Sequence, residues 1–148
     1  MKIRSKPIAQ LEEEAEKDLL IREDRTDTDS ANTPKIFNKY HKELRLVSTE
    51  LINCEAAMRK LWWEKSQYYA GKAHPDVYKE NPLGHKIMKN DVKLYVEADD
   101  DVLKLRVTLE LLEMKRKYIE KKMQEINNRS HHIRNIIKTQ YFKHGMNG

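Results

Sequence analysis

The chain has 148 residues, of which 36% are charged and 39% hydrophobic, with only four glycines and four prolines, a composition that favours long helices over a compact β fold. The net charge of +5 and the pI of about 9.2 permit binding to nucleic acid or to an acidic surface. The single cysteine excludes an internal disulfide and a multi-thiolate metal site, and no apolar run approaches the roughly 18 residues that span a membrane.

Residues 1–33 are predicted to form an acidic N-terminal arm followed by a flexible linker. Residues 11–30 carry nine acids and three bases. Apolar side chains recur in the arm at three- and four-residue steps: Ile8, Leu11, Ala15 and Leu19. We therefore expect a short amphipathic helix over about 7–21, which must dock on something because an isolated helix of this length is marginal. Residues 24–32 are polar and lack periodicity, which predicts the linker.

Residues 34–148 are predicted to form one all-α domain that opens with a long helix over 34–70. Thr33 and Pro34 fit an N-cap followed by proline at the first helical position. Apolar positions then step by three and four without a slip: Phe37, Tyr40, Leu44, Val47, Leu51, Cys54, Met58 and Leu61. Four heptads in register predict a coiled-coil-like seam, and Gly71 is suited to end the helix.

A loop over 71–85, a short helix over 86–97 and a second long helix over 99–144 are expected to follow. The second long helix shows the same alternation, with Asp99, Asp100 and Asp101 at its start, where acids are favourable. A kink is expected near Asn127. The fold class predicted is therefore an all-α helical hairpin of two long heptad-patterned helices.

Self-association is expected because a hairpin of this length hides only one stripe of each helix. The predicted oligomer interface lies on the second long helix: Leu105, Leu109, Leu111, Leu112, Ile119, Met123, Ile126, Ile133, Ile137 and Tyr141. Leu111 sits off the seam and is the best candidate for a second surface.

The end of the first long helix interleaves cations with flat rings, a combination that suits single-stranded nucleic acid because cations meet phosphates and rings stack on bases. The predicted binding residues are Arg59, Lys60, Trp62, Trp63, Lys65, Tyr68, Tyr69 and Lys72. The alternative is that the rings are core and the cations solvated, and spacing alone does not decide. If Trp63 is a packing residue, the cationic face of residues 115–138 is the alternative surface.

No catalytic, metal or cofactor site is predicted. Asp76 with the run 91–93 loosely imitates a metal-dependent nuclease, but that chemistry needs carboxylates on adjacent strands and this run lies in a helical pattern. The histidines lack zinc-ligand spacing, and there is no glycine-rich phosphate loop.

Several stretches in order resemble the UvsY family, the recombination mediators of T-even-type phages and their cyanophage relatives. They are Tyr68-Tyr69-Ala70-Gly71-Lys72, Tyr95-Val96-Glu97-Ala98-Asp99-Asp100-Asp101, and the run from Ile126 through Ile137 to Gly145. The resemblance spans most of residues 36–148 and does not cover the acidic arm. The double tryptophan at 62–63 departs from the family pattern of basic residues before the Tyr-Tyr-x-Gly element.

This resemblance implies a non-enzymatic protein that acts in the cytoplasm of the infected bacterial host. Its expected partners are single-stranded DNA, a RecA-like recombinase, a single-strand-binding protein and further copies of itself in a ring, a hexamer or heptamer. A coiled-coil scaffold or assembly chaperone without a nucleic-acid role is the competing hypothesis. It explains the heptads equally well but not the clustering of cations with aromatic rings.

Overall fold

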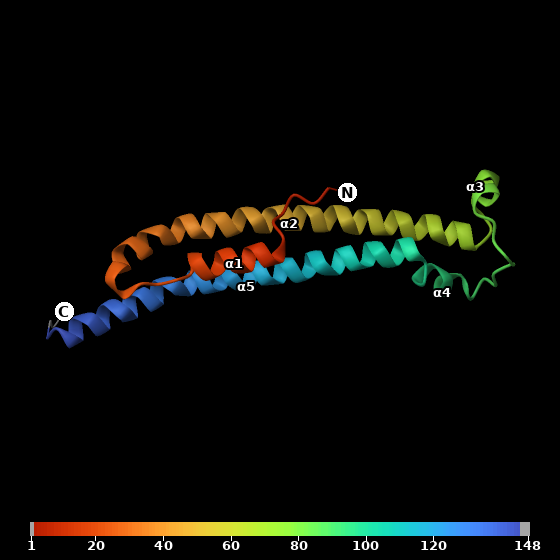
Figure 1. Cartoon of the computed structure of the whole chain (residues 1–148). Helices are drawn as coiled ribbons and strands as arrows, with labels where there is room; N and C mark the ends of the chain where they lie inside the picture. The colour runs from red at the N-terminus through yellow and green to blue at the C-terminus, as the bar shows by residue number, and fades with distance from the viewer. Residues whose placement is uncertain (1, 146–148) are drawn as a thin grey trace. The chain divides into compact units, whose positions relative to one another are not determined.

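The computed structural model describes residues 2–145, and within that range every regular element is a helix (Figure 1). In chain order these are α1 (Ile8–Asp18), the 3-10 turn η1 (Glu23–Arg25), α2 (Thr26–Tyr69), α3 (Pro75–Glu80), α4 (Val92–Glu97) and α5 (Asp100–Lys143). The all-α prediction is confirmed. None of the helices in this range is long and apolar enough to cross a membrane.

The chain divides into two compact units, each of which contains part of α2 and part of α5. Unit 1 comprises Thr49–Glu113, and unit 2 comprises Lys2–Ser48 with the chain from Met114 onward. α2 runs without a break through residues 33 and 34, where the sequence predicts the end of the arm. Residues 1 and 146–148 of the predicted domains lie outside the described range.

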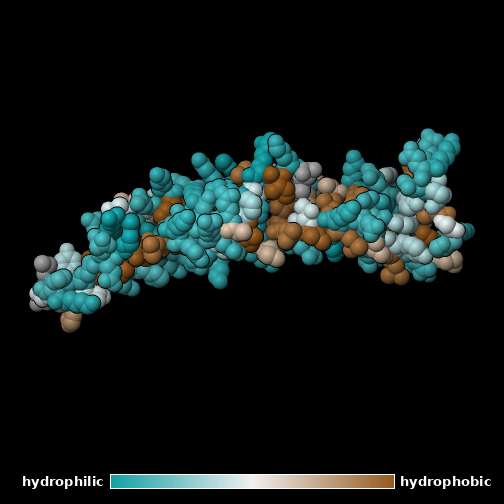
Figure 2. Space-filling model, viewed as in Figure 1, coloured by the Kyte–Doolittle hydropathy of each residue, from teal (hydrophilic) through white to brown (hydrophobic). Residues whose placement is uncertain are grey.

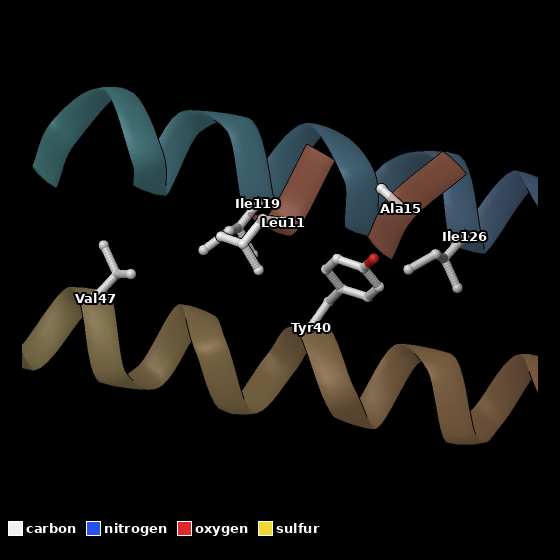
Figure 3. Close-up of a cluster of buried hydrophobic side chains, with 6 residues drawn as sticks. All are labelled: Leu11, Ala15, Tyr40, Val47, Ile119 and Ile126. Atoms are coloured by element: carbon white, nitrogen blue, oxygen red, sulfur yellow. The ribbon is translucent and has the colours of Figure 1, made fainter. Parts of the chain in front are cut away.

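Unit 2 is a three-helix bundle in which α1 packs against α2 and α5. Its core cluster, drawn in Figure 3, contains Leu11, Ala15, Tyr40, Val47, Ile119 and Ile126. The two members from α1 lie four residues apart, so they share one face of that helix, and both are buried. The expectation that the short acidic helix docks on something is met inside the chain itself.

Polar contacts of Glu14 and Asp18 also hold α1 to α2 and to the segment before α1. The Tyr40 hydroxyl donates to Asp18 Oδ2 at 3.0 Å, and Lys39 Nζ lies 2.6 Å from the same oxygen and 3.0 Å from Glu14 Oε2. Lys6 Nζ completes the group at 2.9 Å from Glu14 Oε2. The acids on this face of α1 are therefore ion-paired within the bundle.

The predicted flexible linker over residues 24–32 is wrong, because its first two residues belong to η1 and the rest to α2, which begins at Thr26 and includes Pro34 in its interior. The seam continues here through buried polar side chains, Thr26 and Asp29, which a search for apolar periodicity does not detect. The Asp29 carboxylate accepts from the Arg22 backbone at 2.7 Å and from its guanidinium at 2.8 Å. Buried Arg129 donates to the Asp29 carbonyl at 3.2 Å, so hydrogen bonds from a distant part of the chain help to hold the polar residues of this segment.

Unit 1 has no third long helix over the α2–α5 seam. Its core cluster contains Leu51, Cys54 and Leu112, with Leu105 and Leu109 partly buried against it. A row of large apolar side chains on α5 stays exposed in this unit: Leu103, Val107 and Leu111. They recur at four-residue steps and form one stripe, which we call the exposed α5 stripe. Figure 2 shows hydrophobic residues at the surface along this part of the helix.

The predicted oligomer interface needs correction, because most of its members lie in the intramolecular seam. Leu112, Ile119, Ile126 and Ile133 are buried, and Leu105, Leu109, Met123 and Ile137 are partly buried. Heptad periodicity identifies apolar faces but does not say whether the same chain covers them. Leu111 and Tyr141 are exposed, so among the predicted residues these two remain open to a second copy.

Candidate functional site

The candidate site lies in unit 1, where the end of α2, the connecting segment and the start of α5 come together. α2 ends at Tyr69, and Gly71, two residues beyond, has a φ of +77°. The Lys72 amide donates to the Gln67 carbonyl at 2.9 Å and the Gly71 amide donates to the Tyr68 carbonyl at 3.1 Å. These two bonds form a Schellman motif, which glycine accommodates at this left-handed position without steric cost.

The hydroxyl of Tyr78 on α3 completes this helix end. It donates to the Tyr68 carbonyl at 2.7 Å and accepts from the Ala73 amide at 3.1 Å. The Tyr68 hydroxyl donates in turn to the Asn81 carbonyl at 2.9 Å, and the two tyrosine rings stack with centroids 5.4 Å apart. α3 is therefore attached to α2, and the predicted loop over 71–85 contains a helical turn.

Further rings extend this arrangement toward α4. Tyr69 lies with its centroid 5.0 Å from that of Tyr68 and 5.6 Å from that of Tyr95. The Tyr95 hydroxyl is 3.1 Å from His85 Nε2. Such packed rings stabilise a site beyond the area they bury, so the aromatic cluster of Tyr68, Tyr69, Tyr78 and Tyr95 organises the connection between the two long helices.

Asp99 joins the start of α5 to the end of α2. Its Oδ1 accepts from the amides of Asp101 at 3.0 Å and Val102 at 3.3 Å, as an N-cap does. Its Oδ2 accepts from the Tyr69 hydroxyl at 2.7 Å and lies 3.1 Å from Lys65 Nζ. Lys65 also pairs with Asp101 at 2.9 Å, so its charge is neutralised inside the protein.

The pKa values of this cluster follow from its burial and hydrogen bonds. Desolvation and the bond to Asp99 raise the pKa of Tyr69 to about 12. Burial alone would raise the pKa of Asp99, but the bonds from Tyr69 and Lys65 outweigh it and hold that pKa below the usual range. Burial would lower the pKa of Lys65, and its two carboxylate partners raise it instead. The cluster therefore keeps its charge-paired form at neutral pH.

Four of the predicted binding residues are exposed: Arg59, Lys60, Trp63 and Lys72. No ion pair of the described residues involves any of the three cations. Trp63 is 64% exposed and follows Arg59 by four residues and Lys60 by three, so the ring and both cations lie on neighbouring turns of one helix side. We call these three residues, together with Lys72 just beyond the end of the helix, the open face of α2.

A groove with a volume of about 650 Å³ adjoins this open face. Its lining includes Trp63, Tyr68, Lys72, Val77 and Asp101. The lining therefore combines an exposed indole and an unpaired ammonium group with the Asp101 carboxylate, which already pairs with Lys65. Flat apolar surface beside a free cation can accept a stacked base with its phosphate.

The structure thus divides the predicted site in two. The open face is free to contact a ligand, whereas Lys65, Tyr68 and Tyr69 hold the protein together and Trp62 is partly buried. Sequence reasoning missed Tyr78, whose only local signal is its position in the turn after Pro75. It placed Asp99 at the start of the second long helix but did not identify it as the partner of Lys65.

The residues of the loosely nuclease-like pattern lie at helix starts. Asp76 is in the first turn of α3, and Asp91 immediately precedes α4. Among residues 2–145 no group of three or more His, Cys, Asp or Glu side chains could hold a metal ion.

The fold defined by these helices is shared with crystal structures of a phage recombination mediator protein. A crystal structure of bacteriophage T4 UvsY, in lattice type II, superposes with a TM-score of 0.83, covering 93% of this chain and 98% of that chain at 22% identity. The lattice type I structure gives a TM-score of 0.81, covering 90% of this chain and 98% of that chain at 22% identity.

The sequence comparisons identify the family. Recombination protein uvsY of Enterobacteria phage T4 is 25% identical over 100 residues, which cover 68% of this chain and 70% of that protein. The family model described as "Recombination, repair and ssDNA binding protein UvsY" matches residues 14–146. The chain therefore belongs to the UvsY family, and its role lies in recombination and repair with binding to single-stranded DNA.

Proposed function

We propose that this protein is a non-enzymatic recombination mediator that loads a RecA-like recombinase onto single-stranded DNA covered by single-strand-binding protein in phage-infected bacteria. The observation that carries the proposal is the open face of α2, where an exposed indole lies beside cations that have no acidic partner among the described residues. Stacking on Trp63 requires an unpaired base, so this face selects single strands over duplexes.

Self-association explains how such a small face binds DNA firmly and still releases it. Three cations and one ring per chain give weak contacts, and several copies engaged on one strand multiply them. The exposed α5 stripe of unit 1 is the surface we assign to contact between copies, because a row of exposed leucine and valine side chains is typical of surfaces that bind another protein. A closed ring of six or seven copies would place the open faces on one continuous path.

The proposal is tested by titrating a single-stranded oligonucleotide and a duplex of the same length at two salt concentrations. Arg59→Ala with Lys60→Ala should weaken single-strand binding and flatten its dependence on salt by about 0.7 for each lost phosphate contact. Lys17→Ala with Lys42→Ala removes the same charge from exposed positions in unit 2 and is the matched control.

Loading is tested separately, as the rate of recombinase filament assembly on single strands already covered by single-strand-binding protein. The wild type should raise this rate and the Arg59→Ala, Lys60→Ala variant should not. Absence of single-strand binding in the wild type would contradict the proposal and favour a coiled-coil scaffold without a nucleic-acid role. Degradation of the oligonucleotide in the presence of Mg²⁺ would contradict the non-enzymatic assignment.

A further inference from the structure

The C-terminal part of α5, within unit 2, is strongly basic. From Lys115 to Lys143 it contains nine lysines and arginines but only two acids, Glu120 and Glu125. Four of the cations are engaged within the unit: Lys115 with Ser5, Arg116 with Glu120, Lys122 with Glu125, and Arg129 with the carbonyls of Asp18 and Asp29. Both acids are thus used by cations of the same helix.

The other five cations, Lys117, Lys121, Arg134, Lys138 and Lys143, are exposed, and none makes an ion pair with any described residue. Three of them belong to one outward stripe of seven exposed positions: Lys117, Lys121, Gln124, Asn128, His131, Asn135 and Lys138. These positions recur at steps of three and four residues, so they follow one side of the helix. The stripe carries no carboxylate, and we call it the amide–lysine stripe.

We propose that the amide–lysine stripe binds the sugar–phosphate backbone of nucleic acid, as a second site separate from the open face of α2. Lysine and arginine neutralise phosphates, and asparagine, glutamine and histidine side chains donate hydrogen bonds to phosphate oxygens. At 1.5 Å per residue the stripe from Lys117 to Lys138 extends about 32 Å, long enough to follow several phosphates. This inference does not depend on the recombinase-loading role.

The surroundings of the stripe favour a nucleic-acid backbone over an acidic peptide. Protein interfaces are anchored by apolar and aromatic side chains at their centre. No large hydrophobic side chain is exposed between Lys117 and Lys138, and Figure 2 shows a predominantly hydrophilic surface over this part of α5. Phosphates, which need no apolar anchor, fit such a face.

The absence of exposed tryptophan, tyrosine and phenylalanine side chains from the stripe sets the strand preference. The open face of α2 offers Trp63 for stacking, whereas the amide–lysine stripe between Lys117 and Lys138 offers lysines, side-chain amides and the small imidazole of His131. Stacking discriminates in favour of unpaired bases, and contacts to phosphates do not. The second site therefore accepts duplex DNA as well as single strands, which lets one chain contact a duplex while the open face holds a single strand.

The experiment measures binding of a 30-base-pair duplex to the full chain across a salt series. The test variant combines Lys117→Ala, Lys121→Ala and Lys138→Ala. Its matched control combines Lys86→Ala, Lys89→Ala and Lys104→Ala, which removes the same charge from exposed positions in unit 1. The test variant should bind duplex about tenfold more weakly, with a salt slope flatter by about 3, and the control should change little.

Two further arms separate this proposal from the loading role and from its alternatives. Trp63→Ala should weaken single-strand binding and leave duplex binding unchanged, so failure of one site does not imitate failure of the other. Equal losses of duplex affinity in the test and control variants would overturn the proposal, because they would show that binding depends only on the net charge of the protein. Displacement of the duplex by polyglutamate at equal charge concentration would overturn it in favour of an acidic peptide. Absence of duplex binding in the wild type would also overturn it.

Discussion

Units 1 and 2 use the same pair of long helices but cover them differently. In unit 2, α1 packs into the seam with Leu11 and Ala15 buried, and ion pairs such as Lys39–Asp18 hold it there. In unit 1 the seam has a smaller core around Leu51 and Leu112 and leaves the exposed α5 stripe uncovered. The difference shows where the chain completes its own fold and where it has surface left for other molecules.

Charge follows the same division. The acids of α1 are largely used to neutralise lysines of unit 2, whereas in unit 1 the acids at the start of α5 neutralise Lys65 and leave Arg59 and Lys60 free. A basic residue near an aromatic ring is therefore available to contact a ligand only if it does not already form an ion pair with a carboxylate of the same chain. By this criterion Arg59 and Lys60 belong to the binding surface, whereas Lys65 has a structural role.

The largest expected effect is loss of α1 docking in unit 2. Leu11→Ala should lower the free energy of unfolding by about 2–5 kcal/mol, because it leaves a cavity at a fully buried position. Urea unfolding followed by circular dichroism measures this. Leu20→Ala, an exposed residue just beyond the same helix, is the control and should change little. Equal effects of the two substitutions would mean that α1 is not part of the bundle.

A substitution in the exposed α5 stripe should weaken self-association without affecting folding. Leu111→Glu places a charge in the contact we assign to a second copy and should weaken self-association by about tenfold or more, with helical content unchanged. Sedimentation velocity over a concentration series measures it. Leu20→Glu makes the same change at an exposed site in unit 2 and should leave assembly intact. An unaltered oligomer in the Leu111 variant would place the interface elsewhere.

Lys65 distinguishes a structural cation from a binding one. Lys65→Ala leaves Asp99 and Asp101 without their partner and should cost about 1–2 kcal/mol of stability, since the pair is only partly exposed. Single-strand affinity and its salt slope should stay nearly unchanged. Lys60→Ala should show the opposite pattern, with stability kept and the salt slope flatter by about 0.7. A flatter slope for Lys65→Ala would mean that DNA displaces its carboxylates.

A pH dependence of stability is also expected in unit 2. Hydrogen bonds from Lys6 and Lys39 lower the pKa of Glu14 from 4.5 to about 2. A depressed folded pKa stabilises the protein above pH 4.5, and this stability is lost as the pH falls from 4.5 toward 2. Glu14→Gln should make the free energy of unfolding less dependent on pH between pH 4.5 and pH 2. The exposed neighbour change Glu13→Gln should leave its slope as in the wild type, and identical slopes for all three proteins would contradict the assignment.

The sequence predicts much of the fold because apolar periodicity is strong in both long helices and Gly71 ends the first as expected. It fails over residues 26–33, where the seam is built from Thr26 and Asp29 and depends on hydrogen bonds from distant residues such as Arg129. The same limit affects the candidate site. Spacing puts rings and cations together, but it does not reveal that Asp99, thirty residues further along, binds both Tyr69 and Lys65.

The central claim is that the open face of α2 contacts single-stranded DNA while the aromatic cluster beneath it is structural. Trp63→Ala, measured for both thermal unfolding and single-strand affinity, tests it most directly. The free energy of unfolding should stay within about 0.5 kcal/mol of the wild type, because the ring is largely exposed. Affinity should fall by about 1–3 kcal/mol for the engaged base with the salt slope unchanged. Lower stability with unchanged affinity would contradict the account and make Trp63 a packing residue.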